Sequence, residues 1–187
     1  AAYIAKQMGL PVGKLICASN ANNVLTDFFN KGVYDRRRQF HTTISPSMDI
    51  LISSNLERLI YVTFGSSRCK ELMRRLADEG EYTIDSKELM LIRDSFLGYS
   101  TSRTEGADIM RQTFNEKKYL IDTHTAVALS AAIRYMNDYK AENRMLVVST
   151  ATPYKFAKDT LSAVFETSSD DESAVEILEK LSGVDIP

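Results

Sequence analysis

The sequence predicts an α/β fold that is rich in helices and has a small, mostly parallel sheet flanked by those helices. Apolar runs typical of buried strands, residues 14–18 and 145–148, are each followed by turn residues and then by a helical pattern. Strands that are connected through a helix pair in parallel, whereas antiparallel strands need only a short turn between them. Helical periodicity covers most of the remaining chain, so a sheet of about three strands would be small for the number of helices.

Composition and charge exclude several classes of protein. The 187 residues contain 23 Lys and Arg against 25 Asp and Glu, and this balance argues against a nucleic-acid-binding module. No apolar run reaches the ~20 residues that a membrane-spanning helix needs. The cysteines, Cys17 and Cys69, are too few for a disulfide framework, and no Cys/His cluster has the spacing of a zinc site. We therefore expect a cytoplasmic protein without a metal, a nucleic-acid partner or a membrane partner.

The start of the chain has the order helix, strand, helix. Residues 1–8 are helical in pattern and end at Gly9, because glycine accepts the left-handed conformation of a helix C-terminus. The apolar run 14–18 is the first predicted strand. The polar loop Ser19–Asn23 offers several N-cap side chains to the helix that follows, and this helix should end at Gly32.

A long helix is predicted in the next part of the chain. Residues 35–43 are polar and basic, and they read as an exposed loop. Ser45 and Pro46 follow and should begin the helix, since serine is a good N-cap and proline fits the first helical position. Apolar residues then recur every three or four positions up to Gly65, where the helix should end. A shorter amphipathic helix is predicted over residues 68–79.

Capping boxes mark the starts of two later helices. Asp85 with Glu88, and Ser102 with Glu105, have the spacing at which the N-cap residue and the third helical residue satisfy each other's backbone N–H group. Both pairs precede apolar residues at helical spacing, so a helix is predicted after each.

The last third of the chain contains the second clear strand. Residues 119–121 read as a short extended segment, and the alanine-rich residues 126–136 predict a well-buried helix. The strand over 145–148 leads into Thr152, the expected N-cap of another helix, and Pro153, its first residue.

The chain is expected to divide into a main body, a linker and a last helix. Residues 1–165 form the main body, and the acidic, serine-containing residues 166–171 form the linker. Residues 172–187 hold the last helix. Because residues 1–8 read as the inside of a helix and no methionine precedes them, we expect a piece of a larger protein.

Loops after the predicted strands are the first candidates for a binding site. Open α/β sheets bind ligands beyond the carboxyl ends of their strands. Ser19–Asn23 and Ser149–Pro153 lie there, and both are rich in small hydroxyl or amide side chains. The competing interpretation is helix capping, because the same side chains are the common N-caps. The residues alone leave both interpretations open.

Each remaining reactive side chain has a structural interpretation beside the functional one. His124 precedes the buried helix and could act as an acid or base, or be a hydrogen-bonded structural residue, whereas His41 is expected to be solvated. Cys17 lies in a predicted strand, which favours inert packing, and Cys69 lacks the partner motif of a reactive thiol. Arg36–Arg38 could contact an anionic substrate, but so small a basic patch favours a solvated loop. No phosphate-binding glycine loop and no G-x-S-x-G motif occurs.

Four segments, in this order along the chain, resemble the C-terminal half of the threonine synthase family, whose members are fold type II pyridoxal-phosphate enzymes. They are ICASNANNVL (16–25), SPSMDILISSNLERL (45–59), DTHTAV (122–127) and STATPYKF (149–156). The second segment is long and contiguous and is therefore the most specific. The resemblance extends over nearly the whole chain, and residues 68–115 are its least diagnostic part.

The resemblance implies an activity and a cofactor. Members of the family convert O-phospho-L-homoserine and water to L-threonine and phosphate, with pyridoxal 5′-phosphate held as a Schiff base by a lysine. In the family that lysine and the loop that cradles the cofactor phosphate come before the part that corresponds to Ala1. No lysine of this chain matches the Schiff-base position, so the resemblance implies that the chain carries no catalytic residue and is inactive and without cofactor when alone.

The resemblance also implies roles for individual residues. Thr150 matches the position whose hydroxyl bonds the pyridine nitrogen of the cofactor, and Ser149 helps to orient that loop. Ser45, Ser47 and Asp49, at the expected helix start, would lie near the substrate and could receive its anionic group, although helix capping explains them equally well.

His124 would order the loop near the site. The family usually has Asp-Pro-His-Thr where this chain has Thr123 in place of the proline. The change frees a backbone N–H group and removes some rigidity, but it removes no reactive group.

Two other functions compete with threonine synthase. One is a related fold type II phospho-lyase that uses a different phosphorylated amino acid, and the other is a non-catalytic binding or interaction domain on the same scaffold. In each case a piece of a larger fold should expose apolar surface, so we expect the chain to self-associate.

Overall fold

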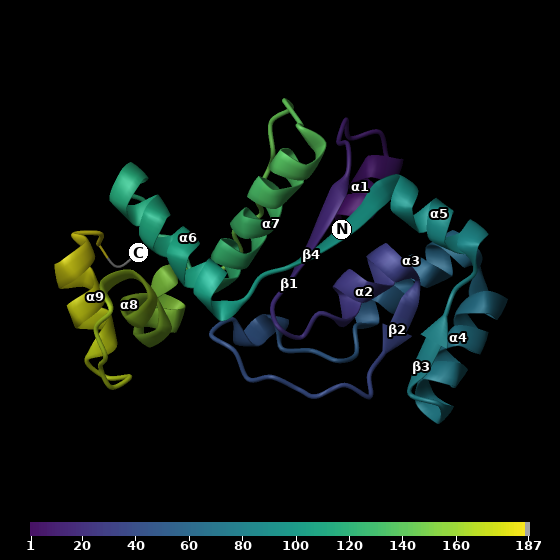
Figure 1. Ribbon diagram of the computed structural model, residues 1–187, viewed down its shortest axis with the longest axis horizontal. Coiled ribbons are helices and arrows are strands. Elements are labelled where there is room, and N and C mark those ends of the chain that lie inside the picture. Colours follow the sequence, from purple (N-terminus) through teal and green to yellow (C-terminus); the bar gives the residue numbers. More distant parts are fainter. Residues whose placement is uncertain (186–187) are drawn as a thin grey trace. The chain divides into compact units, whose positions relative to one another are not determined.

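The computed structural model describes residues 1–185, which fall into two compact units. Unit 1 consists of Ala1–His41 and Asp49–Ser100, and unit 2 of Thr42–Met48 together with the chain from Thr101 onward. Figure 1 shows the elements of both units. Within the described residues, no helix is long and apolar enough to cross a membrane.

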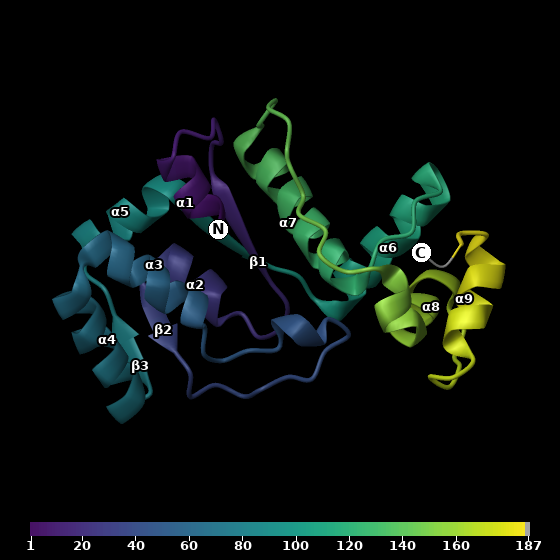
Figure 2. The same cartoon turned by 180° about the vertical axis from the view of Figure 1, so that it is seen from behind.

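Unit 1 contains two small sheets and five helices. Its elements are α1 (Ala2–Gln7), β1 (Leu15–Ser19), α2 (Val24–Lys31), β2 (Val33–Asp35), α3 (Ser54–Phe64), α4 (Ser66–Asp78), β3 (Glu81–Thr83), α5 (Ser86–Ser95) and β4 (Phe96–Ser100). Strands β1 and β4 pair in parallel, with Leu15 opposite Phe96 and Ser19 opposite Ser100, and they run side by side in Figures 1 and 2. Strands β2 and β3 pair antiparallel. The predicted parallel pairing of β1 is confirmed, but the patterns did not predict β2, β3 or β4.

The core of unit 1 is built around aromatic side chains. Phe28 is fully buried, and its ring packs edge-on against the rings of Tyr34 and Tyr82. These two tyrosine rings stack with their centroids 5.4 Å apart, so β2 and β3 are joined by side chains as well as by backbone bonds. Ile60 of α3 and Leu72 of α4 are fully buried in the same cluster.

Gly98 lets α2 lie directly against β4. A Cβ atom at this position would stand 2.7 Å from Cα and 3.0 Å from the carbonyl oxygen of Thr26. The Asn30 side chain fastens the same contact, because its amide donates to the Gly98 carbonyl (2.8 Å) and its oxygen accepts from the Gly98 N–H (3.1 Å).

Unit 2 is helical in its described part. Its elements are the 3₁₀ turn η1 (Pro46–Met48), α6 (Arg103–Lys117), α7 (Thr123–Tyr139), the 3₁₀ turn η2 (Pro153–Phe156), α8 (Ala157–Phe165) and α9 (Ala174–Ser182). Helix α8 packs between α6 and α9, as Figure 2 shows, with Met110, Leu161 and Leu178 fully buried where they meet. The division at the predicted linker, residues 166–171, stays a prediction.

Most of the predicted helix ends are confirmed. Both capping boxes are present, at Asp85 before α5 and at Ser102 before α6, with the reciprocal bonds from Glu88 and Glu105. Gly32 closes α2 and Gly183 closes α9 in the left-handed conformation, and Gly65 ends α3 with a positive φ of 84° but an extended ψ of 172°. Local chemistry therefore determined these boundaries.

The predicted long helix from Ser45 is wrong at its start. Ser45 and Pro46 begin only the turn η1, and α3 begins at Ser54 with Ser53 as its N-cap. A tertiary contact explains the difference, because the buried Tyr34 hydroxyl donates to the Leu51 carbonyl and accepts from the Ser53 N–H, both at 3.0 Å. Because these backbone groups bond the Tyr34 hydroxyl, they are not available for the hydrogen bonds of a helix over residues 50–53.

The predicted strand over residues 145–148 is also wrong. The segment has no regular structure, and Leu146 and Val148 are 84% and 66% exposed. A strand needs a neighbour to bond its backbone, and none of the described strands lies beside this one. Residues 119–121 likewise form no strand, and Leu120 and Ile121 pack as buried loop residues into the core of unit 2.

Candidate functional site

A cluster of polar side chains surrounds the start of α7 in unit 2. Asp122 is the N-cap, and its carboxylate accepts from the backbone N–H groups of His124 (2.8 Å) and Thr125 (3.4 Å). The Thr125 hydroxyl bonds the same carboxylate and also lies 2.9 Å from the Ser149 hydroxyl oxygen. We call Asp122, His124, Thr125 and Ser149 the Asp122 cluster.

His124 links this cluster to the turn η1. Its Nδ1 lies 3.0 Å from the Asp122 carboxylate, and its Nε2 accepts from the Ser47 backbone N–H at 3.1 Å. The imidazole ring also packs on the Phe156 ring, with the centroids 4.5 Å apart. Between the open alternatives for His124, these contacts agree with a residue that orders its surroundings.

The Ser149–Pro153 loop combines two features that the sequence predicted. Thr152 is the N-cap of η2, accepting from the Tyr154 N–H, and Pro153 is its first residue. Ser149 and Thr150 are exposed, Thr152 makes the capping bond of η2, and the Ser149 hydroxyl oxygen lies 2.9 Å from that of Thr125. The loop therefore exposes Thr150 next to Ser149, whose side chain is hydrogen-bonded to Thr125.

The three residues predicted to lie near the substrate, Ser45, Ser47 and Asp49, have different surroundings. Ser45 is buried, and its hydroxyl lies 3.2 Å from that of Thr43. Ser47 is exposed and contributes its backbone N–H to His124. Asp49 belongs to unit 1. Because no long helix begins here, a helix N-terminus is not what would attract an anion to these residues.

In unit 1 the Ser19–Asn23 loop binds a second carboxylate. The amides of Asn20 and Asn22 donate to Asp49 at 2.7 and 3.0 Å, and both asparagines are buried. Asn22 also exchanges hydrogen bonds with the backbone of His41, through its amide (2.7 Å) and its oxygen (2.9 Å). Asn23 is the N-cap of α2 by position but makes no side-chain capping bond. The loop thus holds His41 and Asp49, a role that spacing along the sequence does not reveal.

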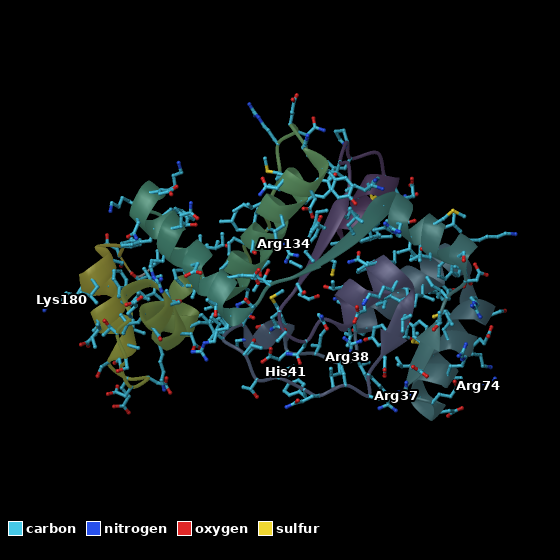
Figure 3. The ribbon with its side chains drawn as sticks, viewed as in Figure 1. Arg37, Arg38, His41, Arg74, Arg134 and Lys180 are labelled. Carbon is cyan, nitrogen blue, oxygen red and sulfur yellow. The ribbon has the colours of Figure 1, made fainter. Side chains whose placement is uncertain are left out.

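The basic segment after β2 is less exposed than predicted, because its arginines have structural partners. Figure 3 shows Arg37, Arg38 and His41 along this stretch. Arg36 donates to the carbonyls that end α4 (2.9 and 3.0 Å), and Arg37 pairs with Asp35. Arg38 binds Asp27 at 2.8 Å; burial alone would raise the pKa of Asp27, but Lys31 and Arg38 outweigh this and lower it. An anion would have to compete with these partners.

Among the described residues, neither cysteine and no metal-binding group adds a reactive centre. Burial raises the pKa of the Cys17 thiol to about 12, so the thiol stays protonated at neutral pH. Burial also raises the pKa of Cys69, whose thiol lies 3.6 Å from the Glu57 carbonyl oxygen. Residues 1–185 contain no group of His, Cys, Asp or Glu side chains that could hold a metal ion.

Comparisons with known proteins agree in pointing to one family, although no protein-family model matches the chain. Human threonine synthase-like 1 is 38% identical over 167 residues, which are 88% of this chain and 22% of the human protein. Threonine synthase of Saccharomyces cerevisiae is 33% identical over 201 aligned positions, covering 97% of this chain and 39% of the yeast protein. A crystal structure of pyridoxal-phosphate-bound threonine synthase from Brucella melitensis has a TM-score of 0.80 and 31% identity, over 97% of this chain and 42% of that chain.

Fold and sequence together define the class of protein: the chain has the fold of one part of a fold type II pyridoxal-phosphate enzyme. Within that class it is homologous to the threonine synthases, as the four sequence segments indicated. It spans roughly two fifths or less of the length of these relatives.

Proposed function

We propose that the chain forms one wall of the active site of a threonine synthase, which converts O-phospho-L-homoserine and water to L-threonine and phosphate. The observation that carries the proposal is the Ser149–Thr150 loop, fixed through Thr125 and presenting the Thr150 hydroxyl in a chain whose relatives are threonine synthases. Such an enzyme is a lyase of amino-acid biosynthesis. The proposal includes a location in the cytoplasm, which imaging of the tagged complete protein tests.

The residues of this chain fit one part of a pyridoxal-phosphate site. When bound, the cofactor supplies an electron sink for charge that develops on the amino-acid substrate. Thr150 would donate to, or accept from, the ring nitrogen as a neutral partner, which does not force that nitrogen to be protonated as a carboxylate would. Ser149 would keep the loop in place. Ser45, Ser47, Asp49 and His124 are proposed to line the substrate side.

The role of Thr150 is tested by removing its hydroxyl and keeping its shape. In the protein expressed from the complete open reading frame, Thr150→Val should lower the rate of phosphate release roughly 5- to 30-fold, the effect of losing a hydrogen bond worth about 1–2 kcal/mol. Thr150→Ser, which keeps the hydroxyl, should retain most of the rate. Thr104→Val removes a hydroxyl from an exposed position on α6 and serves as the matched control. Equal rates for Thr150→Val and Thr104→Val would rule out the proposed role of Thr150.

A second function is favoured by the relatives at 38% identity, which are named threonine synthase-like 1 rather than threonine synthase. A related phospho-lyase would release phosphate from a different phosphorylated amino acid. Phosphate release from O-phospho-L-homoserine, compared with O-phosphoserine and O-phosphothreonine at equal concentrations, separates the two functions. Activity with none of these substrates would favour a non-catalytic binding domain.

The chain by itself is proposed to be inactive and not to bind pyridoxal phosphate specifically. Cofactor added to the purified 187 residues, followed by borohydride reduction and peptide mapping, should give no stoichiometric adduct at a single lysine. Such an adduct would show that the chain carries its own cofactor lysine. The assay decides this point without reference to the substrate.

The chain alone is also proposed to self-associate through exposed apolar side chains. In unit 1, Tyr61 and Val62 of α3 are more than half exposed, as are Met90 and Leu91 of α5. Exposed apolar groups that lie near one another favour association in water. Light scattering should therefore give a mass above that of a 21.0 kDa monomer, and a monomer at high micromolar concentration would contradict this.

A further inference from the structure

The Asp122 carboxylate receives more hydrogen bonds than a helix N-cap needs. An N-cap side chain accepts from the backbone N–H groups two or three residues further on, and Asp122 does so with His124 and Thr125. The side chains of the same two residues bond the carboxylate as well. Since the Asp122 side chain is fully buried, these partners take the place of water around it.

The bond between Ser47 and His124 fixes the direction of the first side-chain contact. A backbone N–H can only donate, so Nε2 of His124 must be the unprotonated nitrogen of a neutral ring. The proton then resides on Nδ1, which donates it to the Asp122 carboxylate 3.0 Å away. This chain of donors, from Ser47 through His124 to Asp122, holds the turn η1 against the start of α7.

The hydroxyl groups of Thr125 and Ser149 also donate in the direction of the Asp122 carboxylate. A carboxylate only accepts, so the single hydroxyl proton of Thr125 goes to Asp122. Ser149 must then donate to the Thr125 oxygen, 2.9 Å away. The second chain of donors, from Ser149 through Thr125, therefore ends on the other oxygen of the same carboxylate and holds the loop that carries Thr150.

We propose that Asp122 is a positioning residue, which orients the Ser149–Thr150 loop through Thr125 and the turn Pro46–Met48 through His124. That the first segment contacts the cofactor and the second the substrate rests on the proposed function. The hydrogen-bond chains do not, because every contact in them lies within unit 2. One buried carboxylate thus sets the positions of two segments that are about a hundred residues apart in sequence.

Amide hydrogen exchange separates the two arms. Thr125→Val should raise exchange roughly tenfold in the peptide covering residues 145–152 and leave residues 43–48 unchanged. His124→Phe should do the reverse, since it keeps a ring against Phe156 but loses both nitrogens. Thr113→Val, which removes a hydroxyl bonded only within α6, is the matched control and should change neither peptide.

A further variant distinguishes positioning from capping. Asp122→Ser retains a good N-cap, so α7 should keep its helicity, but its single short side-chain oxygen cannot accept from both arms. Exchange should therefore rise in both peptides while far-ultraviolet circular dichroism stays unchanged. Wild-type exchange in both peptides of Asp122→Ser, or equal loosening of both peptides by Thr125→Val and by His124→Phe, would overturn the proposal.

The ring protons of His124 give an independent readout. Long-range ¹H–¹⁵N correlation should show the neutral tautomer protonated on Nδ1, with signals assigned by comparison with His41→Ala, since the chain has only these two histidines. The Nε2-protonated tautomer would refute the arm through His124. In the complete enzyme, Thr125→Val should weaken cofactor affinity, and His124→Phe should raise KM for the substrate. If the complete protein releases no phosphate at all, the proposed function fails, and the exchange pattern still decides the role of Asp122.

Discussion

The contact between Gly98 and α2 yields the sharpest stability prediction. In Gly98→Ala the new methyl carbon would lie 2.7 Å from Cα, 3.0 Å from the oxygen and 3.3 Å from the carbonyl carbon of Thr26. All three are backbone atoms, so no side-chain rotation relieves the overlap, and α2 or β4 has to move. That movement also strains the paired hydrogen bonds between Asn30 and Gly98.

The size of the effect follows from these two costs. Overpacking a close contact costs about 1–3 kcal/mol, and weakening two hydrogen bonds adds about 1 kcal/mol. We therefore expect Gly98→Ala to lower the free energy of unfolding by about 3 kcal/mol, which corresponds to roughly 6–12 °C in Tm for a chain of this size.

Urea unfolding followed by circular dichroism and tyrosine fluorescence measures this loss, because the chain has nine tyrosines and no tryptophan. Gly13→Ala is the matched control within unit 1, since a Cβ atom there meets nothing within 4 Å. It should be neutral or stabilise by up to ~1 kcal/mol, because alanine has fewer unfolded conformations. A Gly98→Ala variant as stable as Gly13→Ala would refute the close approach of α2 to β4.

Three further perturbations test local features. Ser102→Ala should cost about 1 kcal/mol in thermal unfolding, since it breaks the capping box with Glu105. Hydrogen bonds from Arg68 lower the pKa of Glu88 below its ordinary 4.5. The ionised Glu88 therefore stabilises the fold fully above pH 4.5, and this stabilisation is lost as the pH falls through the lowered pKa. Acid titration should show the stability gap to Glu88→Gln closing over that range, and a gap independent of pH would contradict it. Cys17, with a pKa of about 12, should react with Ellman's reagent at pH 8 far more slowly in the native chain than after unfolding, and equally rapid labelling of the native chain would contradict the raised pKa.

Short-range chemistry made much of the fold predictable. Capping boxes at Asp85 and Ser102 and the glycine at Gly32 depend on residues within a few positions of each other, and all three are present. The helix predicted from Ser45 failed because Tyr34, distant in sequence, bonds the backbone of residues 51–53. The strand over residues 145–148 failed because a strand depends on a neighbour that periodicity does not show.

The candidate site shows the same division between local and distant chemistry. The cap at Thr152 was predictable from the residues beside it, but the strand expected to place Ser149 and Thr150 at a sheet edge is absent from the described residues. The partnership of Asn20 and Asn22 with Asp49 was not predictable, since no spacing rule connects residues that far apart. Asp122 occupies an intermediate position: its capping bonds involve only the nearby His124 and Thr125, but the two side-chain arms depend on Ser47 and Ser149, which only the fold brings to it.

The geometry of the Asp122 cluster is compatible with the family's usual proline at the position of Thr123. Thr123 is the first residue of α7, a position where proline is favoured because the helix does not use that N–H group. The carboxylate of Asp122 accepts from His124 and Thr125, the two residues beyond it. Asp122 itself has the extended backbone that a following proline requires, with φ −78° and ψ 167°.

Thr123→Pro should therefore leave both hydrogen-bond chains intact and stabilise the chain by up to ~1 kcal/mol, because proline restricts the unfolded state. Thermal unfolding measures the gain, and amide exchange of residues 43–48 and 145–152 should match the wild type. Faster exchange in either peptide would mean that the threonine side chain, which is buried with its hydroxyl 3.4 Å from His124 Nδ1, itself supports the cluster. In that case the substitution at position 123 would have to be counted as part of the site, and the positioning role could no longer be assigned to Asp122 alone.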